Sequence, residues 1–356
     1  MIRQSYGVLV ISGLEALRVG LMGFGQVGRQ IYRLALADDR FDPVAISDIG
    51  QPDILHHLLV TSMGRDPRVS LNGNYLVAGC RNGTHKTRLM SAERPEEIPW
   101  DLLGVDVVID ATGRYRSRTD LAPHLDNGAR RVVTSSLPEG DLDRVLLCGV
   151  NEASALVGDR IVSAGSASTT GMALVLRVVT DARPIAHATM TSVHAYTRDQ
   201  SLYDHAGPDY RRSRSAAENI IPNTTPALKW LEQALPVIKG KVSGFALNVP
   251  VAAGSLLDVT LAFQDDAMGT DEINALFVAA AQAEPELIAV THDPIVSSDV
   301  RGRSQSILLD LQGTLVAGQK LTKLLAWHET LGHARRILDV AALYAALDAA
   351  EPAGES

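Results

Sequence analysis

The first half of the chain alternates short apolar runs with segments in which apolar residues recur at helical spacing. The run at residues 18–22 is followed by glycines and then by the helical pattern of residues 30–36. A second helix is predicted near residues 120–128. Strands that alternate with helices in this way indicate a parallel sheet. The predicted strands are residues 18–22, 44–48, 105–110 and 131–135.

From about residue 168 the pattern changes to longer runs with β character, separated by helices. This grouping predicts an antiparallel or mixed sheet with helices on one face. The predicted strands are residues 188–196, 241–249, 256–263 and 306–311, and the predicted helices are about 168–181, 271–283 and 331–349.

These patterns predict an α/β fold of two domains, in agreement with the length of 356 residues at ~150 residues per domain. Residues 18–167 would form a domain with a parallel sheet. Residues 168–330 would form an α+β domain with a mixed or antiparallel sheet. The last predicted helix, residues 331–349, is rich in Ala and Leu and is expected to pack back onto the first domain.

Composition narrows the class of protein. The net charge of -8 leaves no basic excess to neutralise phosphates, which argues against a nucleic-acid partner. Two cysteines, Cys80 and Cys148, do not imply a disulfide framework. The apolar patch at residues 8–11 is too short to span a membrane and lacks a signal-peptide cleavage pattern. We expect a cytoplasmic enzyme, in which residues 1–17 are either an extension or a misassigned start.

The densest motif is Gly23-Phe-Gly25-Gln-Val-Gly28, directly after a predicted strand and directly before a predicted helix. In this context G-x-G-x-x-G is the fingerprint of a Rossmann dinucleotide site. Gly23 would permit the tight turn, Gly25 the approach of the pyrophosphate, and Gly28 the close packing of helix on strand. The N–H groups at the helix start would face the phosphates. Residues 18–167 are therefore predicted to be a Rossmann domain.

Asp48 ends the second predicted strand, 20 residues beyond Gly28. A carboxylate at this place can accept hydrogen bonds from the ribose hydroxyls, and it repels a 2′-phosphate. The expected cofactor is therefore NAD, in preference to NADP. The competing interpretation is a glycine-rich turn that binds no ligand.

Six segments between residues 18 and 345 resemble the glyceraldehyde-3-phosphate dehydrogenase family. They are VGLMGFG (19–25), DATGRY (110–115), CGVN (148–151), VHAYTRDQ (193–200), RRSRSAAENIIP (211–222) and KGK (239–241). The resemblance implies a homotetramer in which the loop 201–215 lies near a neighbour's cofactor. It also implies cofactor contacts from Phe24, Gln26, Val27, Asp48, Thr112, Gly113 and Ser135. Gln26 stands where the family usually has Arg.

The chain departs from the family at the nucleophile. The family's Ser-Cys-Thr-Thr-Asn-Cys is here residues 167–172, Ala-Ser-Thr-Thr-Gly-Met, so Ser168 takes the place of the catalytic thiol. A thiol near pKa 8.5 can be driven to the thiolate, whereas a serine hydroxyl needs a base acting during attack. The family's phosphorylating oxidation is therefore not expected at a useful rate.

His194 matches the family's catalytic histidine, and three interpretations compete for it. It could act as base for Ser168, it could donate a proton to a carbonyl during reduction, or it could be a structural core histidine. If His194 lies opposite Ser168 and a nicotinamide, a functional role is favoured over a structural one.

The phosphate sites of the family are also altered. Its substrate-phosphate site maps onto Thr197, Asp199 and Asn248, and Asn248 replaces an Arg that would bind phosphate with two hydrogen bonds. Its inorganic-phosphate site maps onto Thr169, Arg212 and Thr225, with Ala167 in place of a Ser and Pro226 in place of a Gly. The alternative for Arg212 is a surface residue within a basic run.

The segment that holds the nicotinamide in the family is one residue shorter here, at residues 327–333. The family's carboxamide-binding Asn has no clear match, so Thr330 or Glu329 would serve. His328 and His333 are interpreted as structural, since no acidic partner or metal-ligand spacing is evident; no metal is expected.

The preferred hypothesis is an NAD-dependent oxidoreductase that transfers hydride directly to or from a carbonyl or hydroxyl carbon in a specialised pathway. The alternatives are a catalytically inactive NAD-binding protein, an enzyme that uses a Ser168–His194 pair as nucleophile and base, and one that uses the nucleotide as substrate. Residual oxidation of glyceraldehyde 3-phosphate is a further possibility.

Overall fold

A computed structural model describes residues 15–62, 68–80, 83–198 and 200–350 of the chain. These residues divide into two compact units. We call residues 15–146, 153–165 and 334–350 the Rossmann unit, and residues 147–152 and 166–333 the mixed-sheet unit. The predictions for residues 1–14 and for Asp199 lie outside the described residues.

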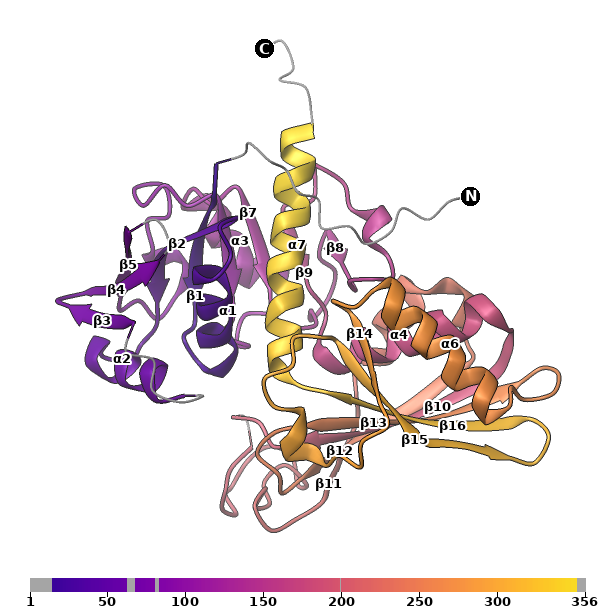
Figure 1. The fold of residues 1–356 in the computed structure, drawn as a ribbon. Coiled ribbons are helices and arrows are strands. Elements are labelled where there is room, and N and C mark those ends of the chain that lie inside the picture. The colour runs from indigo at the N-terminus through magenta and orange to yellow at the C-terminus, as the bar shows by residue number, and fades with distance from the viewer. Residues whose placement is uncertain (1–14, 63–67, 81–82, 199, 351–356) are drawn as a thin grey trace. The chain divides into compact units, whose positions relative to one another are not determined.

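The described part of the Rossmann unit contains one sheet of nine strands in the order β3-β4-β5-β2-β1-β6-β7-β9-β8 (Figure 1). From β2 to β8 all neighbouring strands are parallel, as the alternation of strands and helices predicts. The strands are β1 Leu17–Met22, β2 Phe41–Ser47, β3 Val69–Asn72, β4 Tyr75–Cys80, β5 Gly83–Met90, β6 Val107–Asp110, β7 Arg131–Thr134, β8 Arg144–Val145 and β9 Ile161–Ser163.

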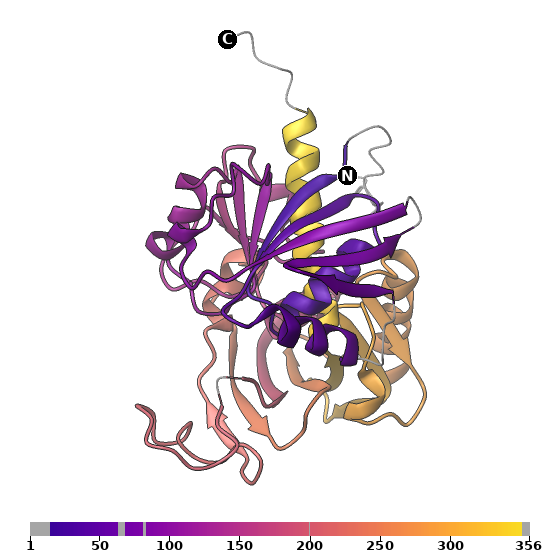
Figure 2. The ribbon, with the colours of Figure 1, turned by 90° about the vertical axis from the view of Figure 1, so that its left-hand side faces the viewer.

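The central strands of this sheet are apolar because both of their faces are covered. All four residues of β6 and of β7 are buried. Figure 2 shows these strands side by side, with the helices of the unit packed against them. The helices are α1 Gln26–Leu36, α2 Pro52–Thr61 and α3 Arg118–Asp126, with a short 3₁₀ turn at Pro95–Glu97.

The last helix, α7 (Thr330–Ala350), begins in the mixed-sheet unit and runs for most of its length in the Rossmann unit. Arg131 of β7 binds the carboxylate of Asp348 with nitrogen–oxygen distances of 2.8 and 3.0 Å. The Tyr344 hydroxyl donates to Asp159 at 2.7 Å, and desolvation by burial is the main cause of the raised pKa of Tyr344. These buried polar contacts hold the helix on the parallel sheet.

The mixed-sheet unit contains seven described strands in the order β11-β12-β10-β13-β16-β15-β14. The pairs β10–β12 and β14–β15 are parallel and the others antiparallel, so the sheet is mixed, as predicted. The strands are β10 Ile185–Ala195, β11 Ile221–Asn223, β12 Val242–Val249, β13 Ser255–Phe263, β14 Ile288–Thr291, β15 Ile307–Ala317 and β16 Leu321–His328.

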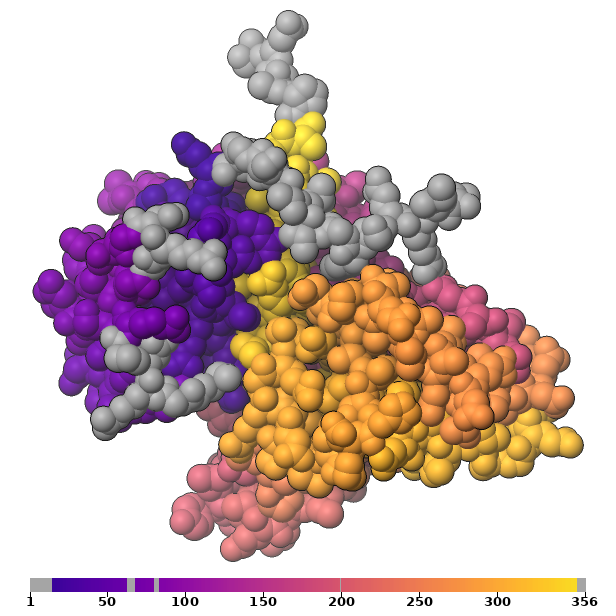
Figure 3. Space-filling view, viewed as in Figure 1, coloured from indigo at the N-terminus to yellow at the C-terminus, as the bar shows by residue number. Residues whose placement is uncertain are grey.

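One buried helix crosses this sheet. Helix α4 (Ala167–Ala182) is buried from Thr169 to Val179 and contacts β10, β13 and β16. It also contacts α5 (Ala227–Ala234) and α6 (Thr270–Ala283), so the three helices lie together. In the space-filling view, α6 and β14 to β16 pack as one continuous body in orange to yellow (Figure 3). Two 3₁₀ turns, Pro236–Ile238 and Ser297–Val300, complete the unit, and a third, Glu152–Ser154, spans the change from one unit to the other.

The fold class predicted from the sequence is confirmed, whereas several elements were missed. Strand β6 begins at Val107 rather than 105, because Val105 donates its N–H to Trp100 and Asp106 to Arg18. Strand β15 continues to Ala317, beyond the predicted residue 311. Strands β3, β4, β5, β8, β9, β11, β14 and β16 and helices α2 and α5 were not predicted. No helix within the described ranges is both long and apolar enough to cross a bilayer.

Candidate active site

The glycine turn between β1 and α1 has the geometry that the motif predicts. Gly23 has φ of +90°, and a Cβ atom there would lie 2.8 Å from the backbone nitrogen of Thr112. A Cβ at Gly28 would lie 2.1 Å from the Gly23 carbonyl oxygen, so only glycine lets helix and turn pack this closely. Helix α1 then begins at Gln26, with no acidic residue in its first turn.

Gly25 differs from the other two glycines of the motif. No heavy atom lies within 4 Å of where its Cβ would be, and its φ of -66° is open to any residue. Packing within the protein therefore does not require a glycine at this position. The approach of a pyrophosphate to the backbone does require one, and in this respect the turn fits a dinucleotide.

Asp48 follows β2 directly, and its carboxylate lies at the glycine turn. One oxygen accepts from the Phe24 N–H at 2.6 Å and the other from the Gly50 N–H at 2.9 Å. The half-buried carboxylate is thus held by backbone donors and cannot turn away. A cavity of about 280 Å³ lies next to Gly50; it is lined by Gly50, Gln51, Pro52, Leu55, Asn74, Arg88, Leu89, Met90 and Ser91.

The other predicted cofactor residues of the Rossmann unit lie at the same edge of the sheet. Thr112 and Gly113 follow β6, and Ser135 follows β7 and donates its N–H to the Asp110 carbonyl at 2.9 Å. The strands β2, β1, β6 and β7 are neighbours, and their carboxyl ends meet at one edge. The chain continues from β1 to β2 on one side and from β6 to β7 on the other, so the strand order reverses between β1 and β6, which is where open α/β sheets bind ligands.

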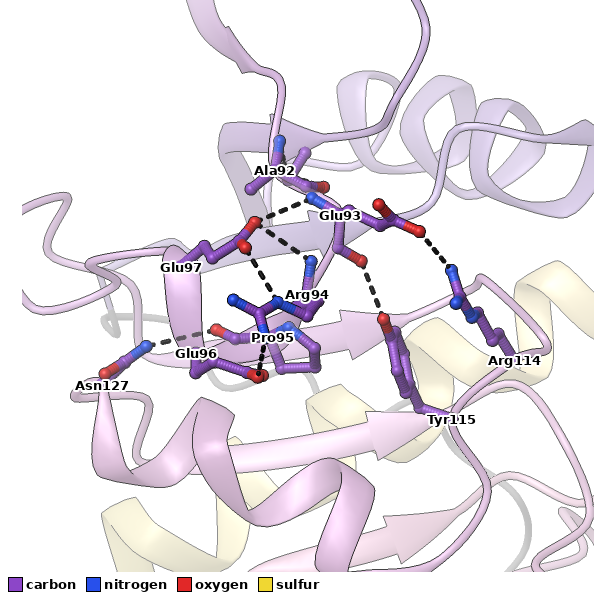
Figure 4. A network of polar contacts seen from close by, with 10 residues as sticks. Ala92, Glu93, Arg94, Pro95, Glu96, Glu97, Arg114, Tyr115 and Asn127 are labelled. Atoms are coloured by element: carbon purple, nitrogen blue, oxygen red, sulfur yellow. Dashed lines mark hydrogen bonds and ion pairs between the residues drawn. The ribbon is translucent and has the colours of Figure 1, made fainter.

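The turn after β6 is tied to the segment before it in the chain, as Figure 4 shows. Arg114 binds the Glu93 carboxylate at 3.0 Å, and the Tyr115 hydroxyl donates to the Glu93 carbonyl at 2.7 Å. On the other side, the Asn127 amide donates to the Pro95 carbonyl at 3.2 Å. The segment 93–97 is therefore held by residues that lie before α3, Arg114 and Tyr115, and by Asn127, which follows it.

In the mixed-sheet unit, Ser168 lies in the first turn of α4. Ser166 caps this helix: its hydroxyl accepts from the Thr169 N–H at 3.2 Å and lies 2.7 Å from the Thr169 hydroxyl. The Ser168 hydroxyl is half-buried and lies 3.5 Å from that of Ser166. A helix N-terminus stabilises negative charge, so this position suits a nucleophile or a group that hydrogen-bonds a reacting oxygen.

His194 lies at the carboxyl end of β10, and its orientation is fixed by the backbone. Its Nδ1 lies 2.6 Å from the Ala195 carbonyl oxygen. Because a carbonyl only accepts hydrogen bonds, Nδ1 carries a proton, and in the neutral ring Nε2 is the acceptor. The ring can therefore accept or return a proton at Nε2. Ser168 and His194, both described, share no hydrogen bond.

His328, at the end of β16, was interpreted from the sequence as structural, and the structure places it against His194. The two rings are 6.1 Å apart between centroids, edge to face. His328 is 2% exposed, and neither ring nitrogen has a hydrogen-bond partner among the described residues. Burial, with repulsion from His194 and His333, lowers its pKa to about 3, so the ring is neutral at physiological pH. The sequence analysis missed this contact because it depends on the register of β16, which decides which residue of that strand ends near His194, with β13 between β16 and β10.

The predicted phosphate residues are only partly brought together. Asn248 of β12 pairs in register with His194, and the Asn223 amide donates to the Asn248 side-chain oxygen. The Thr225 hydroxyl accepts from the Ala227 N–H at the start of α5. Thr169 is buried in the first turn of α4, with its hydroxyl 2.7 Å from that of Ser166. Two others lie on exposed loops: Thr197 after β10, and Arg212, whose N–H donates to Asp209.

Thr330 is the first residue of α7 and belongs to the mixed-sheet unit. Its hydroxyl donates to the Glu329 carboxylate at 3.3 Å, and that carboxylate also accepts from the Gly302 N–H at 3.0 Å. The side chains that could replace the family's Asn are thus engaged with one another. In the part of the chain that the structure describes, no cluster of three or more His, Cys, Asp or Glu residues could hold a metal ion.

One unit is a Rossmann sheet with a glycine turn and a fixed carboxylate. The other carries a histidine at the end of β10 and a hydroxyl at the start of α4. These features together define an NAD-binding oxidoreductase. The pattern "Glyceraldehyde 3-phosphate dehydrogenase, NAD binding domain" matches residues 17–118. The pattern "Glyceraldehyde 3-phosphate dehydrogenase, C-terminal domain" matches residues 166–330. The chain belongs to the glyceraldehyde-3-phosphate dehydrogenase family.

Relatives that are named glyceraldehyde-3-phosphate dehydrogenase match almost the whole chain. The protein of Geobacillus stearothermophilus is 37% identical, over 93% of this chain and 98% of its own length. That of Kitasatospora aureofaciens is 38% identical, over 92% and 99%. That of Haloarcula vallismortis is 37% identical, over 92% and 98%. The sequence-based prediction of the family and of NAD as cofactor is confirmed.

Proposed function

We propose that this member of the family is an NAD-dependent oxidoreductase that transfers hydride directly to or from a carbonyl or hydroxyl carbon, without a covalent acyl-enzyme. One observation carries the proposal: the first turn of α4 presents the hydroxyl of Ser168 where the family's motif has a thiol. A hydroxyl is a far weaker acid than a thiol, and its ester is less reactive than a thioester. The same position still suits a hydroxyl that hydrogen-bonds the reacting oxygen.

His194 would be the acid or base of the reaction. Its Nδ1 is held by the Ala195 carbonyl, so the proton moves at Nε2. In oxidation, Nε2 accepts the proton of the substrate hydroxyl; in reduction, the protonated Nε2 donates it to the carbonyl oxygen. Bound NAD supplies a nicotinamide carbon that accepts hydride and, when reduced, returns it.

The Rossmann unit would hold the cofactor. Gly25 and the first turn of α1, with Phe24, Gln26 and Val27, would contact the pyrophosphate, and Asp48 the adenosine ribose. Thr112, Gly113 and Ser135 would line the same edge of the sheet, and we propose Thr330 for the carboxamide. As in the family, we expect a homotetramer.

The substrate would carry no phosphate group at the position that His194 neighbours. Asn248, which pairs in register with His194, is neutral, and its side-chain oxygen already accepts from Asn223. A neutral amide binds a phosphate group much more weakly than a guanidinium does. Thr197, Thr169, Arg212 and Thr225 remain proposed substrate contacts. Such a substrate suits a specialised pathway better than one that handles phosphorylated sugars.

A panel of aldehydes, ketones and alcohols, with NAD or NADH followed by absorbance, tests the proposal. We expect turnover with an unphosphorylated compound, and His194→Ala should lower kcat by about 10²–10⁴-fold, the usual contribution of a general acid or base. NAD affinity should not change in this variant. Unchanged turnover in His194→Ala would refute the proposed role.

The other outcomes of this panel identify the alternatives. Tight NAD binding in calorimetry with no turnover would indicate a catalytically inactive NAD-binding protein. A covalent adduct on Ser168, detected by mass spectrometry, would indicate a Ser168–His194 nucleophile. Modified NAD after incubation would indicate that the nucleotide is the substrate. Efficient oxidation of glyceraldehyde 3-phosphate with inorganic phosphate would show that the chain catalyses the reaction for which its relatives are named.

A further inference from the structure

Behind the turn after β6, three buried side chains form a row of polar contacts in the Rossmann unit. Trp100, His124 and Asp110 are each 0% exposed. The Trp100 indole N–H donates to His124 Nδ1 at 3.0 Å, and His124 Nε2 lies 3.6 Å from one carboxylate oxygen of Asp110. The other oxygen of Asp110 accepts from the Thr112 N–H at 3.0 Å and from the Thr112 hydroxyl at 2.7 Å.

The direction of every proton in this row is fixed by chemistry. An indole nitrogen only donates, so His124 Nδ1 must accept and cannot carry a proton. In the neutral imidazole the proton is then on Nε2, which points at Asp110. Within the described residues neither His124 Nε2 nor the facing oxygen of Asp110 has a hydrogen-bond partner, so these two buried atoms are the polar groups nearest to hand for each other.

Donors therefore face Asp110 on both sides: Thr112 donates to one oxygen, and His124 Nε2 faces the other at 3.6 Å, which is beyond hydrogen-bond distance. A carboxylate suits this place because it has no hydrogen to donate. An amide of the same shape has one oxygen and one NH2 group. Its NH2 group would therefore face a donor, either Thr112 or His124 Nε2. The row thus requires a carboxylate at this position, whatever its charge contributes elsewhere.

The turn that this row holds packs directly against the dinucleotide turn. The backbone nitrogen of Thr112 would lie 2.8 Å from a Cβ on Gly23, so the two turns touch. The outer contacts of the same connection are weak, because the Arg114–Glu93 pair is 63% and 60% exposed (Figure 4). Asp110 of the buried row therefore holds Thr112 from the interior, beside the backbone bond from the Ala111 N–H to the Met22 carbonyl at 2.7 Å.

We propose that Trp100, His124 and Asp110 are positioning residues for NAD: they hold the Thr112–Gly113 turn in the conformation that the dinucleotide requires. The inference rests on the proposed contacts of Thr112 and Gly113 with the cofactor. It does not depend on the substrate or on the reaction.

The test is a double-mutant cycle on the full chain, with the NAD dissociation constant measured by calorimetry. Asp110→Asn should weaken NAD binding by about tenfold, the scale set by one unpaired buried group. Its oxygen can stay on Thr112 only if its amide faces His124, which then needs its proton on Nδ1, against the Trp100 N–H. Trp100→Phe removes that N–H, so the double variant should bind NAD several-fold more tightly than Asp110→Asn alone.

A purely structural role gives a different result. Because Trp100 and Asp110 both neighbour His124, their effects on stability need not add; under a purely structural role the rescue would appear in the unfolding midpoint while NAD affinity stayed that of wild type. Additive losses, or a lower unfolding midpoint in Asp110→Asn with unchanged NAD affinity, would overturn the proposal. His124→Gln, which keeps one acceptor and one donor, is the matched control and should retain NAD affinity better than His124→Leu.

A measurement on the wild-type chain keeps the proposal testable if Asp110→Asn fails to fold. Nitrogen NMR of His124 should show the proton on Nε2 and an unprotonated Nδ1. A proton on Nδ1 would refute the row. Because these readouts are NAD binding and a tautomer, they can fail while hydride transfer is established, and they can succeed in a protein that turns nothing over.

Discussion

The two units of this protein treat their functional groups differently. In the Rossmann unit, Asp48 is held by backbone N–H groups, and one oxygen of Asp110 is held by Thr112. In the described part of the mixed-sheet unit, Ser168, His328 and Asn248 are not held by backbone N–H groups in this way. His328 is buried without a hydrogen-bond partner among the described residues.

Under the proposed function, this difference would allow the cofactor to be kept while the reaction changes. The backbone donors to Asp48 do not depend on side-chain identity, and the positive φ of Gly23 and the close packing at Gly28 do not tolerate a side chain. A side chain at the start of α4 or at the end of β16 can be exchanged with little effect on the fold. The variants below test this contrast.

The largest expected effect is in the glycine turn, where two neighbouring glycines have opposite reasons to be glycine. Gly28→Ala would place a methyl 2.1 Å from the Gly23 carbonyl, so we expect a loss of about 1–3 kcal/mol in the free energy of unfolding. The higher helix propensity of alanine offsets at most about 1 kcal/mol of this loss. Gly25→Ala meets no protein atom within 4 Å, so stability should stay within about 0.5 kcal/mol.

The affinity for NAD should separate the same two variants from wild type. Gly25→Ala should bind NAD much more weakly in calorimetry although denaturation shows a stable protein, because its methyl occupies the approach of the pyrophosphate. If Gly25→Ala binds NAD like wild type, the turn does not contact the cofactor as we propose.

A somewhat smaller effect is expected from His328 in the mixed-sheet unit. Burial lowers its pKa to about 3 in the folded protein, from 6.5 for an ordinary histidine in an unfolded chain. Between these values the unfolded chain binds the extra proton, so the contribution to stability is complete above pH 6.5 and is lost as the pH falls. At pH 5 the loss is about 2 kcal/mol, from 1.5 pH units at 1.36 kcal/mol each.

His328→Phe should remove this dependence while preserving an aromatic ring of similar size. The free energy of unfolding, measured by denaturant at pH 7 and pH 5, should fall less in the variant than in wild type. His57→Gln, at an exposed histidine of α2, is the control and should follow wild type. Parallel profiles for His328→Phe and wild type would show that His328 is not held neutral.

The smallest effect is expected from Ser168→Cys, which restores the family's thiol. We expect only a slight gain in oxidation of glyceraldehyde 3-phosphate, because Asn248 still stands where a guanidinium would bind the phosphate. The rate of NADH formation with inorganic phosphate measures it, and Ser168→Cys with Asn248→Arg should gain more. Full activity from the single change would show that Ser168 alone separates this chain from its relatives.

Much of the Rossmann unit was predictable because its signals are local. The glycine motif, the strand before it and Asp48 lie within about 30 residues, and each has one conformational reason to be there. The end of β6 was less predictable: the row from Trp100 to Asp110 depends on His124, which approaches only after α3 packs. Nothing in the sequence around His124 indicates a partner.

In the mixed-sheet unit the sequence predicted the strand that carries His194 but not what lies beside it. The contact with His328 depends on β16, which pairs Ser255 with His328 in register. A shift of one residue would turn His328 to the other face of the sheet. The pairing of Asn248 with His194 likewise required the parallel arrangement of β10 and β12, strands that are about 50 residues apart.

The sequence by itself determined the family and the NAD cofactor, and it predicts that Ser168 stands in the place of the family's thiol, because these rest on residue identities and on short spacings. Only the tertiary structure decided which protons are fixed and which are free to move: Nδ1 of His194 is held by a carbonyl, His328 is kept neutral by burial, and Nδ1 of His124 accepts from Trp100. Hydrogen-bond direction and desolvation depend on neighbours that the chain brings together from distant positions, and no local pattern specifies them.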